Sequence, residues 1–416
     1  MIRVIRPATR WGMGPLLIGL GFLVGLDHPV LSKAFAEKTF AEAPPATRPS
    51  LVEIQFKSDR PKLVGELVAE NPKYGLLILS ADGAMTALPP SAVEGGHPDL
   101  AIASIQEIEG SLTPCSKAEV AEKVKALMPP GTKSIQTDHF VVCYNTTDVY
   151  AQWNANLYER MYNGMRRFWS EKGIDVHEPR FPMVALIFST QEEYLNYAKR
   201  DFAGAEGTYG YYEMMANRLA TFDLTGIEGM IPAGVRIQRE ELITEIFSRP
   251  QAERQVATIL HEASHQIAFN TGVQKRLGDN PLWVSEGMAT FFESPDFSKA
   301  GGWGGTGKVN RFQLNNLRRL ASQRPEDSLL RLIVRDEVLR NGDTSQAAYA
   351  ESWGWTFFLI KRRPKQYVEY LELLESRPPG QPSDAKQRLA DFKKCFGDDL
   401  DKLNREFVRF IGSLPR

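Results

Sequence analysis

Two histidines stand four residues apart in the stretch HEASH, which begins at His261. If this stretch is helical, His261 and His265 lie on the same face about one turn apart, so both imidazoles can bind one divalent ion. Glu262 follows the first histidine and could reach a water molecule on that ion without binding the ion itself. The spacing therefore predicts a metal centre in which both histidines are ligands and Glu262 is a general base.

The other explanation of this stretch is an ordinary helix with two hydrogen-bonded histidines on one face. Histidine is scarce, with 6 copies in 416 residues, so an accidental H-E-x-x-H pattern is expected in well under ~5% of such chains. The remaining histidines are scattered and are not assigned to the metal: His28, His97, His139 and His177.

A catalytic zinc ion needs a third protein ligand and one open position for water. The stretch NPLWVSEGMATFFE, residues 280–293, predicts a second helix with Asn280 as its cap and Glu286 in its first turns. The residues between the two motifs are enough for a turn that brings this helix back against the first. The sequence thus predicts one Zn²⁺ ion held by His261, His265 and Glu286.

The first helix is expected to begin near Pro250 and to end between Asn270 and Gly272. Beyond the second helix, Glu293 or Asp296 could hold a ligand histidine through its second ring nitrogen. Both acidic residues could equally be solvated charges at a helix end, and the sequence leaves these alternatives open.

The motif HEASH followed by WVSEGMA resembles the gluzincin branch of the zinc metallopeptidases, the superfamily of thermolysin and the aminopeptidase-N-like enzymes. The matching positions of its W-x-x-E-G-x-A pattern are Trp283, Glu286, Gly287 and Ala289. By resemblance, Glu286 is the third zinc ligand beside the two histidines, and Glu262 is the general base. The resemblance also implies a zincin-like metallopeptidase domain with a mixed sheet and an active-site helix.

The resemblance is strongest over residues 261–293 and extends loosely over 133–374, where the layout looks like a poorly characterised group of secreted bacterial gluzincin-like proteins. The chain departs from the thermolysin subfamily because Glu286 is not in an N-E-x-x-S-D context. It also lacks an obvious G-x-M-E-N signature of the aminopeptidase-N-like enzymes. These departures favour an endopeptidase over an aminopeptidase.

The expected chemistry is peptide hydrolysis by metal-activated water, since Zn²⁺ lowers the pKa of bound water to about 7. Glu262 would take the proton and later deliver it to the leaving amine. The developing oxyanion needs another donor, and gluzincins commonly use a downstream tyrosine or histidine. No histidine follows His265, so Tyr349 is the candidate, with a packed core tyrosine as the usual alternative. Weaker competitors are Tyr209, Tyr211 and Tyr212.

The N-terminus has the order of a secretory signal: a basic start, an apolar run and small residues. We expect a signal peptide over residues 1–36 and a Pro- and Ala-rich linker over 37–50, with an uncleaved anchor as the alternative. The body of the protein is then secreted or periplasmic, without stable membrane association after cleavage. Three cysteines are too few for a disulfide scaffold.

The rest of the chain predicts an α+β fold. Period-two patterns over residues 51–111 indicate a small β-barrel-like domain. Alternating strands and helices over 133–300 indicate the zincin-like core, and residues 301–416 form a helical C-terminal subdomain. The formal net charge of −1 offers no broad basic field for nucleic acid. The sequence does not indicate an oligomeric state.

A protein or peptide substrate is expected to bind beside an edge strand of the core. The candidate edge strand is residues 214–223, with Asn217 and Ala220 near the cleft. The sequence therefore favours a secreted zinc-dependent peptidase. Two alternatives remain: a zinc-binding but inactive gluzincin-fold scaffold, and an envelope interaction protein that acts through its β domain.

Overall fold

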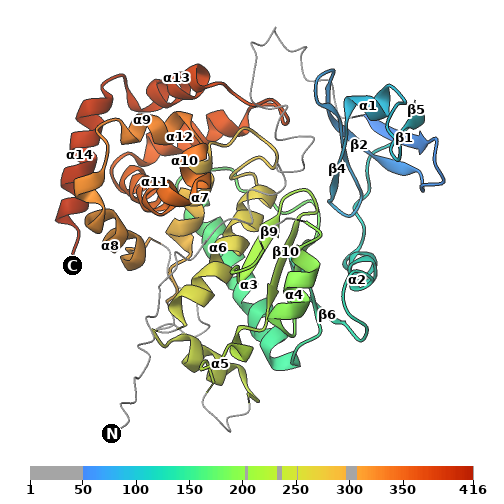
Figure 1. Cartoon of the computed structure of the whole chain (residues 1–416), viewed down its shortest axis with the longest axis horizontal. Helices are drawn as coiled ribbons and strands as arrows, with labels where there is room; N and C mark the ends of the chain where they lie inside the picture. Colours follow the sequence, from blue (N-terminus) through green and yellow to red (C-terminus); the bar gives the residue numbers. More distant parts are fainter. Residues whose placement is uncertain (1–49, 202–204, 232–236, 251, 297–306, 416) are drawn as a thin grey trace, which may run out of the picture.

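The computed structural model describes residues 50–201, 205–231, 237–250, 252–296 and 307–415. Within these ranges the chain forms two five-stranded sheets and 14 α-helices, which confirms the α+β class (Figure 1). The expected signal peptide and nearly all of the expected linker lie outside the described residues. No helix in the described ranges is long and apolar enough to cross a membrane.

The first sheet is antiparallel, with the strand order β4-β3-β2-β1-β5. Its strands are β1 (Leu51–Phe56), β2 (Leu63–Asn71), β3 (Gly75–Leu79), β4 (Met85–Leu88) and β5 (Ile102–Glu107), and the short helix α1 (Pro90–Val93) follows β4. Val52 and Ile54 of β1 are buried, as the period-two pattern predicts. The predicted strands between residues 51 and 111 are thus present and have an apolar cluster of their own.

The second sheet has the order β6-β7-β8-β10-β9. Its strands are β6 (Lys133–Gln136), β7 (Phe140–Tyr144), β8 (Met183–Phe188), β9 (Gly210–Glu213) and β10 (Arg218–Phe222). Strands β7, β8 and β10 are parallel neighbours, and the outer strands β6 and β9 are antiparallel. Every residue of β7 and β8 is buried, as expected for parallel strands in the middle of a sheet.

The predicted edge strand was wrong. The outer strand on this side is β9, and β10 lies between β8 and β9. The two strands form a hairpin whose turn contains Asn217 at a φ of 55°, and the sequence pattern was interpreted as a single strand. Asn217 is a buried turn residue whose side chain donates to Asn270 Oδ1.

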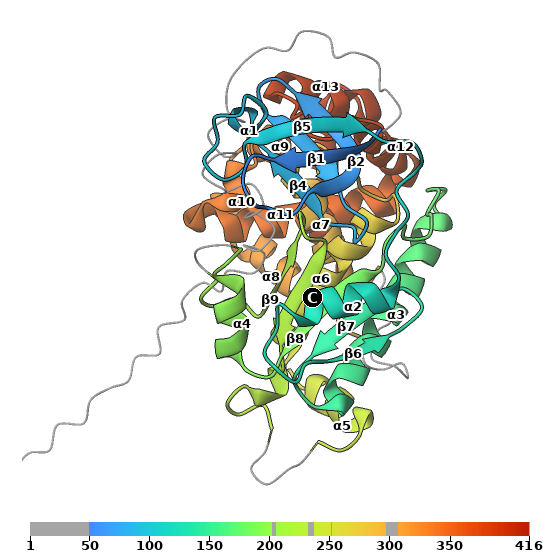
Figure 2. The same cartoon turned by 90° about the vertical axis from the view of Figure 1, so that its right-hand side faces the viewer.

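Helices surround the second sheet and form the C-terminal part of the chain (Figures 1 and 2). The helices up to residue 292 are α2 (Lys117–Lys125), α3 (Asp148–Ser170), α4 (Gln191–Ala198), α5 (Glu240–Phe247), α6 (Glu253–Asn270) and α7 (Leu282–Phe292). Those that follow are α8 (Arg311–Arg319), α9 (Ser328–Val334), α10 (Glu337–Arg340), α11 (Gly342–Arg362), α12 (Pro364–Glu375), α13 (Ala385–Phe396) and α14 (Leu400–Ser413). One apolar core joins the second sheet, α6, α7 and the C-terminal helices, so the two predicted parts pack as one body.

Candidate metal centre

Helices α6 and α7 carry the two halves of the predicted motif. The histidine helix spans Glu253–Asn270, close to its predicted limits. The predicted cap of α7 was wrong, because the side chain of Asn280 donates to the Lys275 carbonyl instead. The first amide of α7, Leu282 N, donates to Asp336 Oδ1 at 3.0 Å. A carboxylate far along the chain therefore satisfies the start of this helix, where negative charge is favoured.

His261, His265 and Glu286 converge in one buried cluster. Their possible ligand atoms all lie within 4.8 Å of one another. His261 Nε2 is 3.1 Å from Glu286 Oε2, and His265 Nε2 is 3.2 Å from His261 Nε2. Each of the three residues is 1% exposed or less. The group could hold a metal ion, as the sequence predicted from the spacing of these residues.

Charge in the cluster favours a cation. Burial alone would raise the pKa of Glu286, but the neighbouring histidines lower it to about 2. Burial lowers the pKa of His265, which favours the neutral imidazole that binds metals. Burial also opposes the charged form of His261, but the carboxylates of Glu286 and Glu293 raise its pKa well above 6.5. Positive charge is thus stabilised between two carboxylates, which fits a divalent cation.

A second carboxylate orients the first histidine. His261 Nδ1 is 2.8 Å from Glu293 Oε2, which leaves Nε2 to face the cluster. The other oxygen of Glu293 accepts a hydrogen bond from Asn310 Nδ2 at 2.8 Å. Asp296, the alternative that the sequence left open, forms an ion pair with Lys308. Asn310 caps α8 and had no signal in the sequence, because its role depends on where α8 packs.

Replacing Glu293 with glutamine should weaken metal binding by about 10- to 100-fold, as loss of such an outer carboxylate typically does. The amide cannot stabilise the His261 ring as a carboxylate does. Competition with a coloured chelator measures the affinity. Asp296→Asn is the matched control and should change the affinity less than about twofold, since Asp296 forms its ion pair with Lys308. Equal affinity in the Glu293 variant and the wild type would contradict this role.

Glu262 lies next to the cluster and is 1% exposed. Its Oε2 accepts a hydrogen bond from the backbone amide of Tyr212 at 2.8 Å. Burial raises the pKa of the Glu262 carboxyl to about 7, although the neighbouring His261 lowers it. The structure therefore places the predicted base beside the ligands and holds one of its oxygens from strand β9.

Tyr349 reaches the same cluster from helix α11. Its hydroxyl is hydrogen-bonded to Glu286, and burial together with the carboxylates of Glu286 and Glu262 raises its pKa well above 10. Of the competing tyrosines, Tyr211 bonds Asp201, the hydroxyl of Tyr212 donates to Asn217, and the ring of Tyr209 lies beside Phe222. Tyr349 is thus brought to the centre, as predicted.

Close packing of α7 against α11 brings Tyr349 to Glu286. A Cβ atom at Gly287 would lie 2.2 Å from Thr356 Oγ1 and 2.6 Å from the Ser352 carbonyl oxygen. Real Cβ atoms do not approach other atoms so closely, so only glycine allows this spacing. The glycine of the W-x-x-E-G-x-A pattern is therefore explained by a helix contact in this fold.

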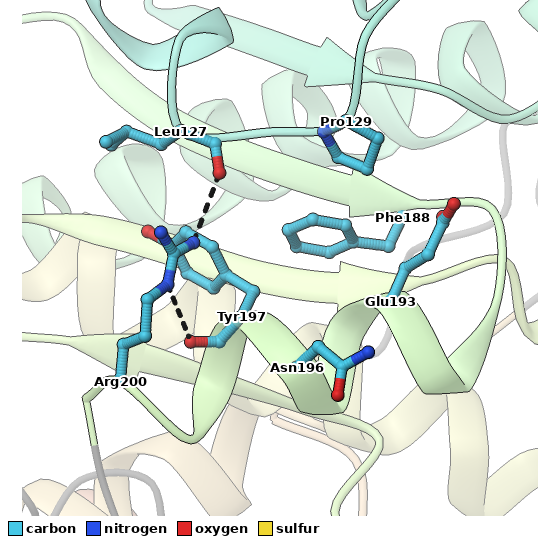
Figure 3. Close-up of a pocket in the computed structure, with 7 residues that line it drawn as sticks. All are labelled: Leu127, Pro129, Phe188, Glu193, Asn196, Tyr197 and Arg200. Atoms are coloured by element: carbon cyan, nitrogen blue, oxygen red, sulfur yellow. Dashed lines mark hydrogen bonds between the residues drawn. The ribbon is translucent and has the colours of Figure 1, made fainter.

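A separate hollow of about 250 Å³ lies beside α4 (Figure 3). Its lining residues are Leu127, Pro129, Phe188, Glu193, Asn196, Tyr197 and Arg200. Arg200 crosses it and donates to the Leu127 carbonyl at 3.1 Å. None of the candidate site residues lines this hollow, so it is not part of the metal centre.

Residues 255–381 match the model of a family described as a protein of unknown function, DUF1570. This segment includes all five predicted site residues: His261, Glu262, His265, Glu286 and Tyr349. No curated protein matches the chain. The matched segment therefore carries every ligand candidate, but Tyr212, which holds Glu262, lies outside it.

Proposed function

We propose that this protein is a secreted or periplasmic zinc-dependent peptidase of the gluzincin type. His261, His265 and Glu286 would hold one Zn²⁺ ion, and Glu262 would act as the general base. The observation that carries the proposal is the buried His-His-Glu cluster with the carboxylate of Glu262 beside it. Glu262 is not one of the three candidate metal ligands. A purely metal-holding cluster has no use for a carboxyl group whose pKa is raised to about 7.

A zinc ion bound there supplies Lewis acidity, which activates water and polarises a peptide carbonyl. Glu262 would accept a proton and later donate it. The Tyr212 amide fixes Oε2, so Oε1 is the oxygen that takes a proton from water and passes it to the leaving amine. A pKa near 7 suits both steps at neutral pH, because the group can then accept and release the proton.

Tyr349 would donate a hydrogen bond to the oxyanion that forms on the carbonyl carbon. Its raised pKa keeps the phenol protonated and able to donate. Tyr349→Phe should lower kcat by about 10²- to 10³-fold, the usual effect of removing one oxyanion donor. Steady-state kinetics on a cleaved peptide measure this loss.

Tyr158→Phe is the matched control for this substitution. Tyr158 is buried like Tyr349, and its hydroxyl has no hydrogen-bond partner within the described part of the chain. Its kcat should equal that of the wild type. A kcat for Tyr349→Phe equal to that of this control would remove Tyr349 from the mechanism.

An extended peptide would bind along strand β9. This strand is the outer strand of the sheet, and its Tyr212 amide faces Glu262, so the edge lies beside the reacting centre. Main-chain hydrogen bonds to such an edge suit a polypeptide substrate. The proposal favours cleavage within the peptide rather than at its N-terminus.

A zinc-binding scaffold without activity is the second candidate. The observation in its favour is burial, because His261, Glu262, His265 and Glu286 are each 1% exposed or less. A peptide can reach these groups only if neighbouring segments move. The two candidates therefore share the metal and differ in turnover.

The test is metal analysis of the purified protein followed by digestion of a mixed peptide library. The proposed function predicts about one zinc ion per chain, internal cleavage, loss of cleavage with a chelator and recovery with zinc. Zinc without cleavage would support the scaffold. Both candidates would be overturned if the protein did not bind zinc in a stoichiometric amount.

A further inference from the structure

Tyr212 connects the candidate base to the rest of the protein. Its backbone amide donates to Glu262 Oε2 at 2.8 Å. Its ring stacks on Phe269 with centroids 6.1 Å apart, and Phe269 stacks on the ligand His265 at 6.3 Å. A displacement of Tyr212 would therefore move the partner of the base and disturb the packing of a ligand.

The hydroxyl of Tyr212 is held by one hydrogen bond and lies near a buried cation. It donates to Asn217 Oδ1 at 2.7 Å. Burial raises the pKa of this hydroxyl, and the nearby guanidinium of Arg276 opposes the rise. Tyr212 is fully buried and Arg276 is 8% exposed, so these contacts are shielded from water. Buried polar groups of this kind are costly to leave without a partner.

Arg276 also reaches the small β domain. Its Nη2 donates to the carbonyl oxygen of Gly83 at 2.7 Å, in the turn between β3 and β4. Beside this turn, the amide of Met85 donates to the carbonyl of Met215 in the β9–β10 turn at 2.7 Å. Figures 1 and 2 show the small sheet next to this hairpin. Arg276 thus lies between Gly83, to which it donates a hydrogen bond, and Tyr212, whose amide donates to Glu262.

A second arginine attaches the small β domain at a different point. Arg180 forms two hydrogen bonds with Glu66 of β2, at 2.7 and 2.5 Å. Nearby, Leu79, Leu112 and Phe181 form a small apolar cluster. Phe181 lies against Gly83, but Arg180 itself bonds Glu66 and the Leu112 carbonyl. Replacing Arg180 therefore weakens docking of the domain without removing the bond from Arg276 to Gly83.

We propose that the small β domain is a positioning element of the candidate site and that Arg276 is the positioning residue. Arg276 donates to the β3–β4 turn and places its charge beside the hydroxyl of Tyr212, whose amide then fixes Glu262. Arginine suits this role because its planar fork presents several donors in fixed directions. The inference rests on the proposed function for the role of Glu262, but the geometry can be tested without activity.

Hydrogen exchange at the Tyr212 amide tests the geometry. The variants are Arg276→Met, Tyr212→Phe and the control Arg180→Met. In the first two, the Tyr212 amide should exchange at least about tenfold faster than in the wild type, because its bond to Glu262 opens more often. Arg180→Met should leave this exchange unchanged. If Arg276→Met does not fold, Tyr212→Phe still removes the same link. Unchanged exchange in Tyr212→Phe, or equal changes in all three variants, would overturn the proposal.

Kinetics test the consequence. Arg276→Met and Tyr212→Phe should each lower kcat by about 10- to 100-fold, with KM within about threefold and zinc content unchanged, since misplacing a catalytic group costs such factors. The double variant, with Arg276→Met and Tyr212→Phe, should have a kcat no lower than that of the slower single variant. Both substitutions remove the same connection, so the second adds no further loss. If the kcat losses of the two single variants add up in the double variant, the two substitutions damage the structure independently. If the wild-type protein cleaves no peptide, the proposed function fails while the exchange result still decides this inference.

Discussion

Glu262→Gln should abolish peptide cleavage while the protein still binds about one zinc ion. Glutamine has the size of glutamate and can still accept the hydrogen bond from the Tyr212 amide, so the local structure should persist. It cannot take up a proton from water or deliver one to the leaving amine. Removing a general acid–base group typically costs about 10²- to 10⁴-fold, and Glu262 would act in both directions. The upper part of that range is expected for kcat.

The control for this substitution is Glu253→Gln, which makes the same chemical change in the exposed first turn of α6. Its kcat and zinc content should match the wild type. Zinc content is measured together with kcat, so that loss of the metal is not mistaken for loss of the base. Cleavage by Glu262→Gln at more than about a tenth of the wild-type rate would exclude Glu262 as the general base.

The residues that could be predicted from the sequence are those whose positions follow from local periodicity. His261, Glu262 and His265 are placed relative to one another by the helix alone. Glu286 required one further assumption, that α7 returns against α6, and its neighbours in the motif supported that step. These four residues could therefore be predicted before any tertiary contact was known.

Apart from Glu293, which the sequence offered as an alternative to Asp296, the supporting residues could not be predicted, because each depends on a contact between distant segments. The acceptor at the start of α7 is Asp336 rather than the adjacent Asn280. Asn310 reaches Glu293 only because α8 begins beside the end of α7. The edge strand was misplaced for a related reason, since Asn217 allows a tight turn where the pattern suggested one continuous strand. Polar side chains with several possible partners give no periodic signal.

This contrast follows from how the site is built. Helix α6 presents the two histidines and Glu262, but their neighbours come from other segments. Strand β9 holds one oxygen of Glu262, Glu293 holds the second nitrogen of His261, and α11 brings Tyr349 to the site. Substitutions in these supports should therefore alter rate or metal affinity while the H-E-x-x-H motif stays intact. The most severe of them concerns the contact between α7 and α11.

Gly287→Ala should damage both stability and turnover. The new methyl group would meet Thr356 Oγ1 at 2.2 Å and the Ser352 carbonyl oxygen at 2.6 Å, and the second of these is backbone that cannot rotate away. Overpacking of this kind costs about 1–3 kcal/mol of folding free energy. To relieve it, α11 must move away from α7, which takes Tyr349 away from Glu286. A shift of about 1 Å in a catalytic group can cost about 10²-fold in rate.

The matched control is Gly412→Ala, because Gly412 is also a helical glycine, but a Cβ atom there would meet no neighbouring segment within 4 Å. Alanine there should raise stability by up to about 1 kcal/mol and leave kcat unchanged. Thermal midpoints give the stability of both variants, and kcat is measured well below those midpoints so that the chain is folded. A Gly287→Ala protein with a lower midpoint but the wild-type kcat would mean that α11 does not position Tyr349. A low kcat in folded protein is expected instead, because the one methyl group separates the helices that bring the ligand and the tyrosine together.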